Sequence, residues 1–299
     1  MKQSDLVSIV IPTFNHAPLL NRALESVRQQ TYQNWEAIVV NNFSTDNTIE
    51  VVESFKDPRI KLINFSNNGI IAASRNQGIN AASGKYIAFL DSDDKWYPTK
   101  LEKCVDSAQT GAQLICHGEL WINTDSSTRS VMYGPVKNAK YKKLLFRGNC
   151  ISTSATFIQT SLLRNVHGFD ESAEIVTAED YELWLRLAEQ KPLTVFIPEL
   201  LGEFHRLANS ASSAVLRNLS SEKEVLKRHF ARQKQTVTNQ LRMRHRMAIA
   251  NYGAARQLNS QPRQALKLFL TAWRLSPFLF KTYAGLMLLA KNSMTQKPK

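Results

Sequence analysis

Short apolar runs alternate with helical patterns along the first hundred residues of the chain. Apolar runs at residues 7–11, 35–40 and 86–90 predict strands, the first two of them buried, and residues 60–63 predict a further short strand. In the segments between them, apolar residues recur every three or four positions, which predicts helices at residues 18–27, 46–55 and 70–82. Strand and helix alternating at this spacing predict βαβ units with right-handed crossovers, and therefore an α/β fold with a mostly parallel sheet.

The rest of the chain divides into an irregular segment and a helical one. Helical patterns cover residues 99–109 and 179–189, and strand-like runs cover residues 114–116 and 155–158. From residue 213 onward the pattern is helical, with polar breaks at residues 259–262 and 276–277. We therefore expect an α/β domain over residues 1–212 and a helical extension over residues 213–299.

Polar residues follow three of the predicted strands directly. In parallel α/β sheets, ligands bind beyond the carboxyl ends of the strands, so these residues are the first candidates for a binding site. They are Pro12, Thr13, Phe14 and Asn15 after the first strand, Asn41 and Asn42 after the second, and Asp91, Ser92, Asp93 and Asp94 after the fourth.

The last of these segments places three carboxylates within four residues. Such carboxylates repel one another, and a divalent cation would remove that cost, because hard cations prefer oxygen ligands. Mg²⁺ typically binds one or two carboxylates together with substrate phosphates, which suits a diphosphate ligand. The alternative is a solvated acidic turn; the position directly after a buried strand favours the metal site.

The charge of the chain is unevenly distributed. Its net charge is +13, but residues 1–214 hold 21 Lys and Arg against 23 Asp and Glu, whereas residues 215–299 hold 17 against two. The first part therefore carries −2 and the second +15. Because the basicity belongs to the helical extension alone, the total charge is no argument for a nucleic-acid partner, and we expect none.

The three cysteines, Cys104, Cys116 and Cys150, are widely spaced and form no CxxC pair. This spacing argues against a disulfide framework or a zinc site and fits a reducing cytoplasm. No signal-peptide pattern is present, and no run reaches the roughly 18 apolar residues of a membrane span. The expected location is cytoplasmic, with a peripheral position on the inner face of the membrane as an option.

Four segments together resemble the family 2 inverting glycosyltransferases with a GT-A fold. The segments are residues 7–15, 44–48, 75–76 and 89–94, and the resemblance covers about residues 5–212. It implies a Rossmann-like, mostly parallel sheet, with a nucleotide-binding half at about residues 5–98 and an acceptor half at about residues 99–212. It also implies hexosyl or related transfer, with inversion, from a nucleotide-diphosphate sugar to an acceptor hydroxyl, dependent on Mn²⁺ or Mg²⁺. The expected setting is the synthesis of cell-surface glycans or polysaccharides, with a glycan or lipid-linked acceptor.

The resemblance assigns roles to the candidate residues. Pro12, Thr13, Phe14 and Asn15 would contact the nucleoside, Asn42 the base, Arg75 the nucleotide, Asp91 and Ser92 the ribose or metal region, and Asp93 the metal that holds the diphosphate. One departure stands out, because the family usually has an acidic residue where this chain has Asn41 and Asn42. An amide oxygen accepts a hydrogen bond from a base N–H, but without charge.

The resemblance also implies that the pair Glu179 and Asp180 contains the catalytic base, and we favour Asp180 over Glu179. Inversion needs a carboxylate that deprotonates the acceptor hydroxyl on the face opposite the leaving group. The alternative is structural: acidic residues are common in the first turn of a helix, and Thr177 with Asp180 has the spacing of a capping box.

Two further segments stay open. Near the diphosphate the family carries an Arg and, two residues on, a His; His205 and Leu207 occupy these positions here, which leaves Arg206 or His205 as substitutes. We nevertheless favour a surface histidine at position 205. In the extension, Leu266, Phe269, Leu270 and Trp273 form an apolar stripe flanked by Arg263, Lys267 and Arg274. This pattern predicts contact with an anionic membrane surface. Helix packing alone and a tetratricopeptide-like partner site are the alternatives.

Missing motifs argue against two other enzyme classes. A sugar-phosphate nucleotidyltransferase would carry a glycine-rich phosphate loop early in the chain, and residues 12–21 contain no glycine. A dinucleotide dehydrogenase would carry GxGxxG after the first strand, and that motif is absent. A non-catalytic nucleotide-sugar-binding or scaffold protein with a degenerate site remains the alternative from another class.

Overall fold

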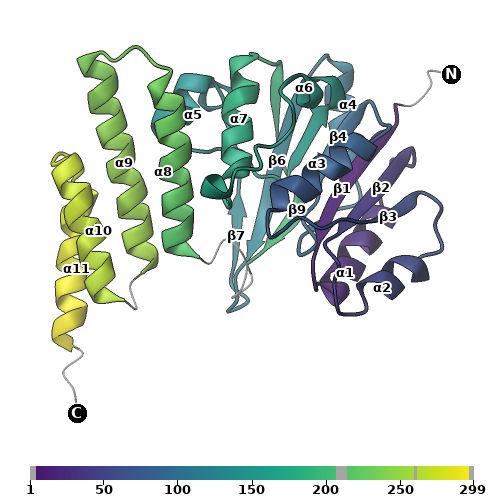
Figure 1. Cartoon of the computed structure of the whole chain (residues 1–299), viewed down its shortest axis with the longest axis horizontal. Helices are drawn as coiled ribbons and strands as arrows, with labels where there is room; N and C mark the ends of the chain where they lie inside the picture. The colour runs from purple at the N-terminus through teal and green to yellow at the C-terminus, as the bar shows by residue number, and fades with distance from the viewer. Residues whose placement is uncertain (1–4, 207–213, 259–260, 296–299) are drawn as a thin grey trace.

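The computed structural model describes residues 5–206, 214–258 and 261–295, and it is built around one nine-stranded sheet (Figure 1). The sheet order is β3-β2-β1-β4-β8-β6-β9-β5, with β7 paired to β6. The strands of the first half are β1 (Val7–Thr13), β2 (Trp35–Asn41), β3 (Ile60–Asn64) and β4 (Tyr86–Phe89), and they pair in parallel. The predicted α/β fold and the four predicted strands are confirmed.

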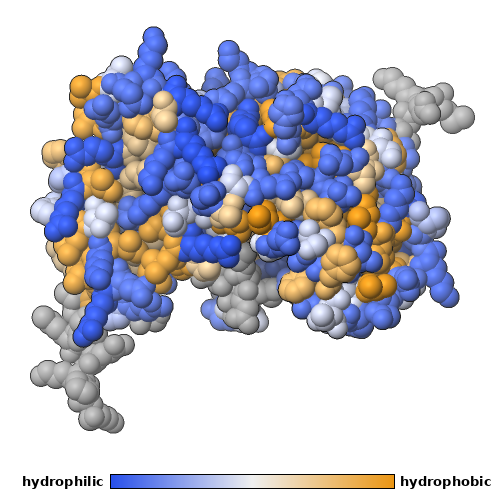
Figure 2. All heavy atoms as spheres, in the orientation of Figure 1, coloured by the Kyte–Doolittle hydropathy of each residue, from blue (hydrophilic) through white to orange (hydrophobic). Residues whose placement is uncertain are grey.

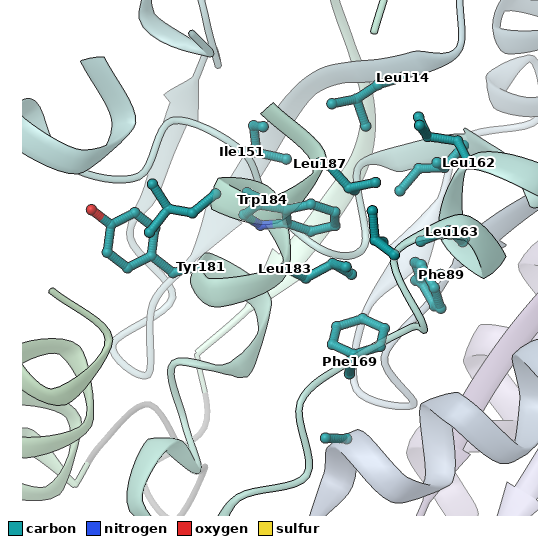
Figure 3. Close-up of a cluster of buried hydrophobic side chains, with 14 of the residues drawn as sticks. Phe89, Leu114, Ile151, Leu162, Leu163, Phe169, Tyr181, Leu183, Trp184 and Leu187 are labelled. Carbon is teal, nitrogen blue, oxygen red and sulfur yellow. The ribbon is translucent and has the colours of Figure 1, made fainter. Parts of the chain in front are cut away.

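The apolar runs form strands because both faces of the sheet are covered. Every residue of β1 and β2 is buried. On one face lie α1 (Ala17–Arg28), α2 (Thr48–Ser54) and α4 (Lys100–Gln109). On the other face lie α3 (Ile71–Ala81), α6 (Thr160–Asn165) and α7 (Glu179–Glu189). Figure 3 shows the core on this second face, where Trp184 and Leu187 of α7 lie beside Leu162, Leu163 and Phe89.

The second half of the sheet mixes strand directions. Its strands are β8 (Thr156–Gln159), β6 (Leu114–Ile122), β9 (Thr194–His205), β5 (Lys95–Trp96) and β7 (Thr128–Val131). β8 runs antiparallel to β4 and β6, whereas β9 runs parallel to β6 with register shifts around Gly118. The sequence pattern predicts only the first three residues of β6, and it misses β9, β5 and β7. β7 is mostly exposed and β9 is mostly half-buried, with a Pro-Glu interruption between its apolar residues, so no continuous apolar run marks these strands.

Shorter elements complete the connections of this half. They are η1 (Val136–Asn138), α5 (Tyr141–Arg147) and η2 (Ala173–Ile175).

Four helices follow the sheet: α8 (Val215–Ala231), α9 (Val237–Gln257), α10 (Pro262–Leu275) and α11 (Lys281–Thr295). α8 packs directly on α7, because Val225 and Leu226 belong to the same buried cluster as Trp184. His229 of α8 is buried, and its Nε2 lies 3.4 Å from Glu182 Oε1 of α7. α10 packs on α9 and α11 packs on α10, and these two helices lie farthest from the sheet (Figure 1). Among the described residues, no helix is both long and apolar enough to cross a membrane.

This packing predicts where the chain tolerates truncation. A chain ending at residue 258 should unfold cooperatively and still bind nucleotide, because it keeps Val225, Leu226 and His229 in place. A chain ending at residue 213 should lose cooperative unfolding, because it removes Val225 and Leu226 and opens the core beside α7. Thermal unfolding followed by circular dichroism measures both. Equal cooperativity in the two truncated chains would contradict the inferred role of α8, and the division at residues 212 and 213 stays a prediction.

Candidate active site

The candidate residues of the first half meet at one edge of the sheet. Thr13 at the end of β1 lies opposite Asn41 at the end of β2 in the parallel register. Beyond these strands, the Asn15 N–H donates to Ser44 Oγ at 2.9 Å, and the Thr45 N–H donates to Asn15 Oδ1 at 2.7 Å. The two loops are therefore linked to each other beyond the carboxyl ends of neighbouring strands.

The predicted nucleoside residues have different environments. Pro12 is buried within β1, whereas Phe14 and Asn15 are exposed. Thr13 is buried, and its Oγ1 has no hydrogen-bond partner among the described residues. A buried hydroxyl without a partner carries a desolvation cost that a bound ligand would relieve. Thr13 therefore fits a contact with the donor.

The two asparagines are already engaged by the protein. Asn41 is fully buried, its Nδ2 donates to Asn64 Oδ1 at 2.8 Å, and its Oδ1 accepts from Ser44. Asn42 is half-buried, and its Oδ1 accepts the Asn67 N–H at 2.9 Å. An amide oxygen has two lone pairs, so Asn42 retains capacity for one more donor. Asn42 is the asparagine that fits a base contact, and Asn41 is structural.

The three carboxylates after β4 divide into two kinds. Asp94 is buried, and its oxygens accept from Ser154 Oγ at 2.5 Å and from the His205 N–H at 3.0 Å. Asp91 and Asp93 are half-buried. Asp94 therefore anchors the loop to β9, while Asp91 and Asp93 are the pair left to meet a ligand.

Electrostatics of this pair suits a cation. Burial and the neighbouring charge of Asp91 raise the pKa of Asp93 to about 6. Burial and the charge of Asp93 raise the pKa of Asp94 well above its usual value. No group of three or more metal-ligating side chains forms among the described residues. Two carboxylates completed by substrate phosphates are, however, the usual ligands of Mg²⁺, so Asp91 and Asp93 fit a cation that arrives with a diphosphate.

Ser92 lies inside the loop between these acids. Its side chain is buried, and its Oγ lies 2.9 Å from His16 Nδ1, beyond β1. In this structure Ser92 therefore joins the acidic loop to the start of α1.

Arg75 of α3 connects the acidic loop to α7. Its guanidinium is buried, with Nη2 donating to Asp91 Oδ1 and Nη1 donating to Glu179 Oε1, both at 2.8 Å. The guanidinium also lies 5.4 Å from the centre of the Phe169 ring. The predicted position of Arg75 beside the nucleotide is compatible with this arrangement, but what Arg75 contacts here is the pair of carboxylates.

Glu179 and Asp180 lie in the first turn of α7, and the capping box considered for Thr177 and Asp180 is not formed. The cap residue is Ala178 without a side-chain hydrogen bond, and Thr177 has a φ of 84° with its Oγ1 unpaired among the described residues. Glu179 Oε2 instead accepts the Thr177 N–H at 2.7 Å. Burial and the charge of Glu179 raise the pKa of Asp180 to about 7, while Arg75 opposes the shift. A half-buried carboxyl with this pKa suits a general base at neutral pH.

A loop of three hydroxyl residues before β8 was missed by sequence reasoning. Thr153 Oγ1 lies 3.5 Å from Asp180 Oδ2, and Ser154 Oγ donates to Asp94. Ser154 Oγ also accepts the Asp91 N–H at 3.1 Å. The loop therefore reaches both the acidic segment and the base. No spacing in the sequence indicates it, since its partners lie at least 27 residues away.

The prediction of a surface histidine at position 205 is wrong. His205 is half-buried, with Nε2 3.0 Å from Glu203 Oε2 and Nδ1 3.3 Å from Arg22 Nη1. Arg22 of α1 also donates to the carbonyl oxygen of Asp93. His205 and Arg22 thus border the acidic loop. Arg206 is exposed, and its guanidinium lies 6.0 Å from the centre of the Trp121 ring.

Comparisons with known proteins agree with this geometry. Residues 8–166, more than half of the chain, match the model of Glycosyl transferase family 2. The chain is 33% identical over 222 residues to the UDP-Glc:alpha-D-GlcNAc-diphosphoundecaprenol beta-1,3-glucosyltransferase WfgD of Escherichia coli, covering 74% of this chain and 85% of that protein. It is 34% identical over 199 residues to the putative colanic acid biosynthesis glycosyl transferase WcaA of Escherichia coli K12, covering 62% and 67%.

Solved structures share the fold at low sequence identity. Staphylococcus aureus TarS 1-349 in complex with UDP-GlcNAc superposes with a TM-score of 0.60 at 15% identity, covering 94% of this chain and 91% of that one. The mannosyltransferase PcManGT from Pyrobaculum calidifontis, in complex with GDP-Man and Mn2+, superposes with a TM-score of 0.60 at 17% identity, covering 98% and 81%. These similarities confirm the predicted GT-A fold. The chain belongs to glycosyl transferase family 2 and is a glycosyltransferase.

Proposed function

We propose that the chain transfers a sugar, with inversion, from a nucleotide-diphosphate sugar to a hydroxyl of a lipid-linked glycan, with the help of a divalent cation. One observation carries this proposal: the buried Arg75 holds the acidic loop at Asp91 and the pair at Glu179 in one site. This connection supports the proposal that Asp91 and Asp93, as cation ligands, and Asp180, as general base, act on the same substrate. A scaffold protein would have no use for this arrangement.

The comparisons support the classes of donor and acceptor. The name of WfgD states UDP-Glc as its donor and a diphosphoundecaprenol-linked GlcNAc as its acceptor. The structural neighbours hold UDP-GlcNAc and GDP-Man. We therefore propose a hexosyl donor on a nucleoside diphosphate and an acceptor glycan that is carried by a lipid. The setting is the synthesis of a cell-surface polysaccharide.

Asp91 and Asp93 are the residues that would hold the cation, which we propose to be Mn²⁺ or Mg²⁺. When bound, the cation supplies neutralising charge for the departing nucleoside diphosphate. Arg75 keeps Asp91 in place through Oδ1. Thr13 and Asn42 bind the nucleoside at the ends of β1 and β2, with Asn42 offering its second lone pair to a base N–H.

Asp180 is the general base in this proposal. Both oxygens of Glu179 accept hydrogen bonds, from Arg75 and from the Thr177 N–H. Asp180 Oδ1 accepts the Tyr181 N–H, while Oδ2 has only the 3.5 Å contact with Thr153 among the described residues. Asp180 Oδ2 therefore takes the proton from the acceptor hydroxyl. The oxygen of that hydroxyl attacks the anomeric carbon of the sugar, and the bond from this carbon to the nucleoside diphosphate breaks. Glu179 fixes the position of Arg75.

The first catalytic prediction tests the cation. Asp93→Ala should abolish transfer without lowering the unfolding temperature, because a carboxylate with a raised pKa costs the folded state stability at neutral pH. Asp106→Ala, at an exposed carboxylate of α4, is the matched control and should keep full activity. Product formation is measured with Mn²⁺ and with excess chelator. Full activity in the presence of chelator would exclude a required cation.

The second prediction tests the base. Asp180→Asn keeps the size of the side chain but accepts no proton, so turnover should fall about 10²–10⁴-fold. In the unmodified protein, turnover should fall as the pH drops through about 7, since Asp180 becomes protonated. That acid limb should vanish in Asp180→Asn and persist in the control Glu50→Gln, at an exposed carboxylate. A dead Glu179→Gln beside an active Asp180→Asn would reverse the assignment.

A lipid-linked acceptor places the enzyme at a membrane surface, and α10 and α11 carry the features for it. Eight large apolar side chains on these helices and their connection are exposed: Leu266, Leu270, Trp273, Phe278, Phe280, Tyr283, Met287 and Leu288. In Figure 2, orange atoms gather over this end of the molecule beside strongly blue ones. Phe269, by contrast, is buried against Ala265 and Leu289, so the predicted stripe is partly a packing face. We propose that the exposed apolar side chains contact an anionic bilayer, and that the net charge of +15 on residues 215–299 attracts the chain to it.

This proposal predicts salt-dependent binding to anionic vesicles. The full chain should sediment with vesicles rich in phosphatidylserine or phosphatidylglycerol, and rising salt should release it, because attraction of about 1 kcal/mol per basic residue is screened. A chain ending at residue 258 should bind far less while keeping donor hydrolysis. Equal binding to neutral and anionic vesicles would contradict the electrostatic part. If the chain bound neither kind of vesicle, the basic helices would be assigned to a protein partner instead.

A further inference from the structure

The backbone conformation singles out two residues at the active site. Eight non-glycine residues among those described have a positive φ, a conformation that L side chains rarely adopt. Six of them have a local reason: Lys56, His167 and Lys191 follow the ends of helices, Asn15 and Asn68 are asparagines, and Ser126 lies in the turn between β6 and β7. The other two are Thr177, beside the proposed base, and Phe43, beside the proposed nucleoside site.

The turn after β2 imposes this conformation on Phe43. Asn41 Oδ1 accepts both the Ser44 N–H, at 3.0 Å, and Ser44 Oγ, at 2.6 Å, which fixes the chain between them. Phe43 has a φ of 52°, where its Cβ crowds the following carbonyl oxygen. Glycine would meet the demand of the turn without strain. The fold therefore gains nothing from a phenylalanine at this position.

The side chain of Phe43 adds a second cost. Its ring is 59% exposed, and Phe43 belongs to none of the buried apolar clusters in the described part of the chain. Exposed apolar surface at a strained position is typical of functional sites, where a ligand covers it. The neighbours agree, because Asn42 precedes Phe43 and Ser44 is bonded to Asn15 on the loop after β1. Phe14 on that loop is also 50% exposed.

We propose that the ring of Phe43 stacks on the nucleobase of the donor and is a main determinant of nucleotide affinity. This inference rests on the proposed function, since it assumes that a nucleoside diphosphate binds beyond β1 and β2. Every base has a π-face, so stacking on an aromatic side chain supplies affinity without selecting the base. It also offsets the absence of an acidic residue at Asn41 and Asn42. Phe43 provides through stacking what a charged acceptor would provide through hydrogen bonding.

The test compares two ligands on the unmodified chain and three variants. UDP and pyrophosphate, each with Mn²⁺, are titrated calorimetrically into the full chain and into Phe43→Gly, Phe43→Tyr and Lys191→Gly. Phe43→Gly should weaken UDP about tenfold, the usual order of one lost base stack, and leave pyrophosphate unchanged. Phe43→Tyr should bind UDP as the unmodified chain does. Lys191→Gly makes the same type of change at a residue whose φ is also 52°, at the far end of α7, and should alter neither affinity.

Stability provides the second readout. Phe43→Gly and Lys191→Gly should both unfold at or above the temperature of the unmodified chain, since glycine adopts a positive φ without strain. A weaker affinity for UDP in a protein of equal or greater stability is what stacking predicts and what a damaged fold does not. Equal weakening of UDP and pyrophosphate would overturn the proposal, because Phe43 would then shape the loop alone. Unchanged affinity for UDP would also overturn it. If the unmodified chain bound neither ligand, the proposed function itself would fail.

Discussion

The buried guanidinium of Arg75 is the interaction on which the rest of the site depends. It lies between Asp91, which follows β4, and Glu179, which opens α7. One guanidinium group therefore joins the loop after β4 to the helix α7. Removing one member of a buried ionic group typically costs about 3–5 kcal/mol, because the others keep uncompensated charge. The spatial relation between the acidic loop after β4 and the start of α7 is therefore built into the stability of the fold.

The other acids are distributed around this centre according to what each contacts. Both carboxylate oxygens of Asp94 accept hydrogen bonds, from Ser154 Oγ and from the His205 N–H, and the second bond connects the acidic loop to β9. Asp93 keeps a carboxylate whose pKa is raised by burial and by Asp91, and it meets no salt-bridge partner among the described residues. The loop thus carries more negative charge than the protein neutralises by itself. In the proposed function, a cation that arrives with the donor diphosphate would complete the balance, so that donor binding and cation binding would support each other.

The sequence predicted those parts of the fold and site that local patterns encode. The strands β1 to β4 are continuous apolar runs, and the candidate residues follow their ends, which the topology of parallel sheets brings together. Contacts between distant segments were not predictable in this way. Arg75 and Glu179 are 104 residues apart, and nothing in either segment indicates the pairing. The prediction of a surface histidine at position 205 was wrong for the same reason, because the burial of His205 depends on contacts with Asp94 and Arg22. The sequence pattern did not predict β9, because most of its residues are only partly buried and its apolar positions are interrupted by polar ones.

The separation of charge along the chain follows from the opposing demands of its two ends. A site that holds a cation between carboxylates needs a surplus of negative charge, and residues 1–214 carry −2. An anionic bilayer would be repelled by that surplus at close range. Electrostatic effects between exposed charges fall off over about 8 Å at physiological salt, so a basic surface must lie well away from the acids to act independently. The basic residues of α10 and α11 meet this condition, because α10 packs on α9 and α11 on α10 at the end of the molecule farthest from the sheet (Figure 1). The basic residues of α8 and α9 lie nearer the sheet, since α8 packs on α7 through the core. The same packing that completes the catalytic core thereby fixes the orientation of the basic helices relative to Asp180.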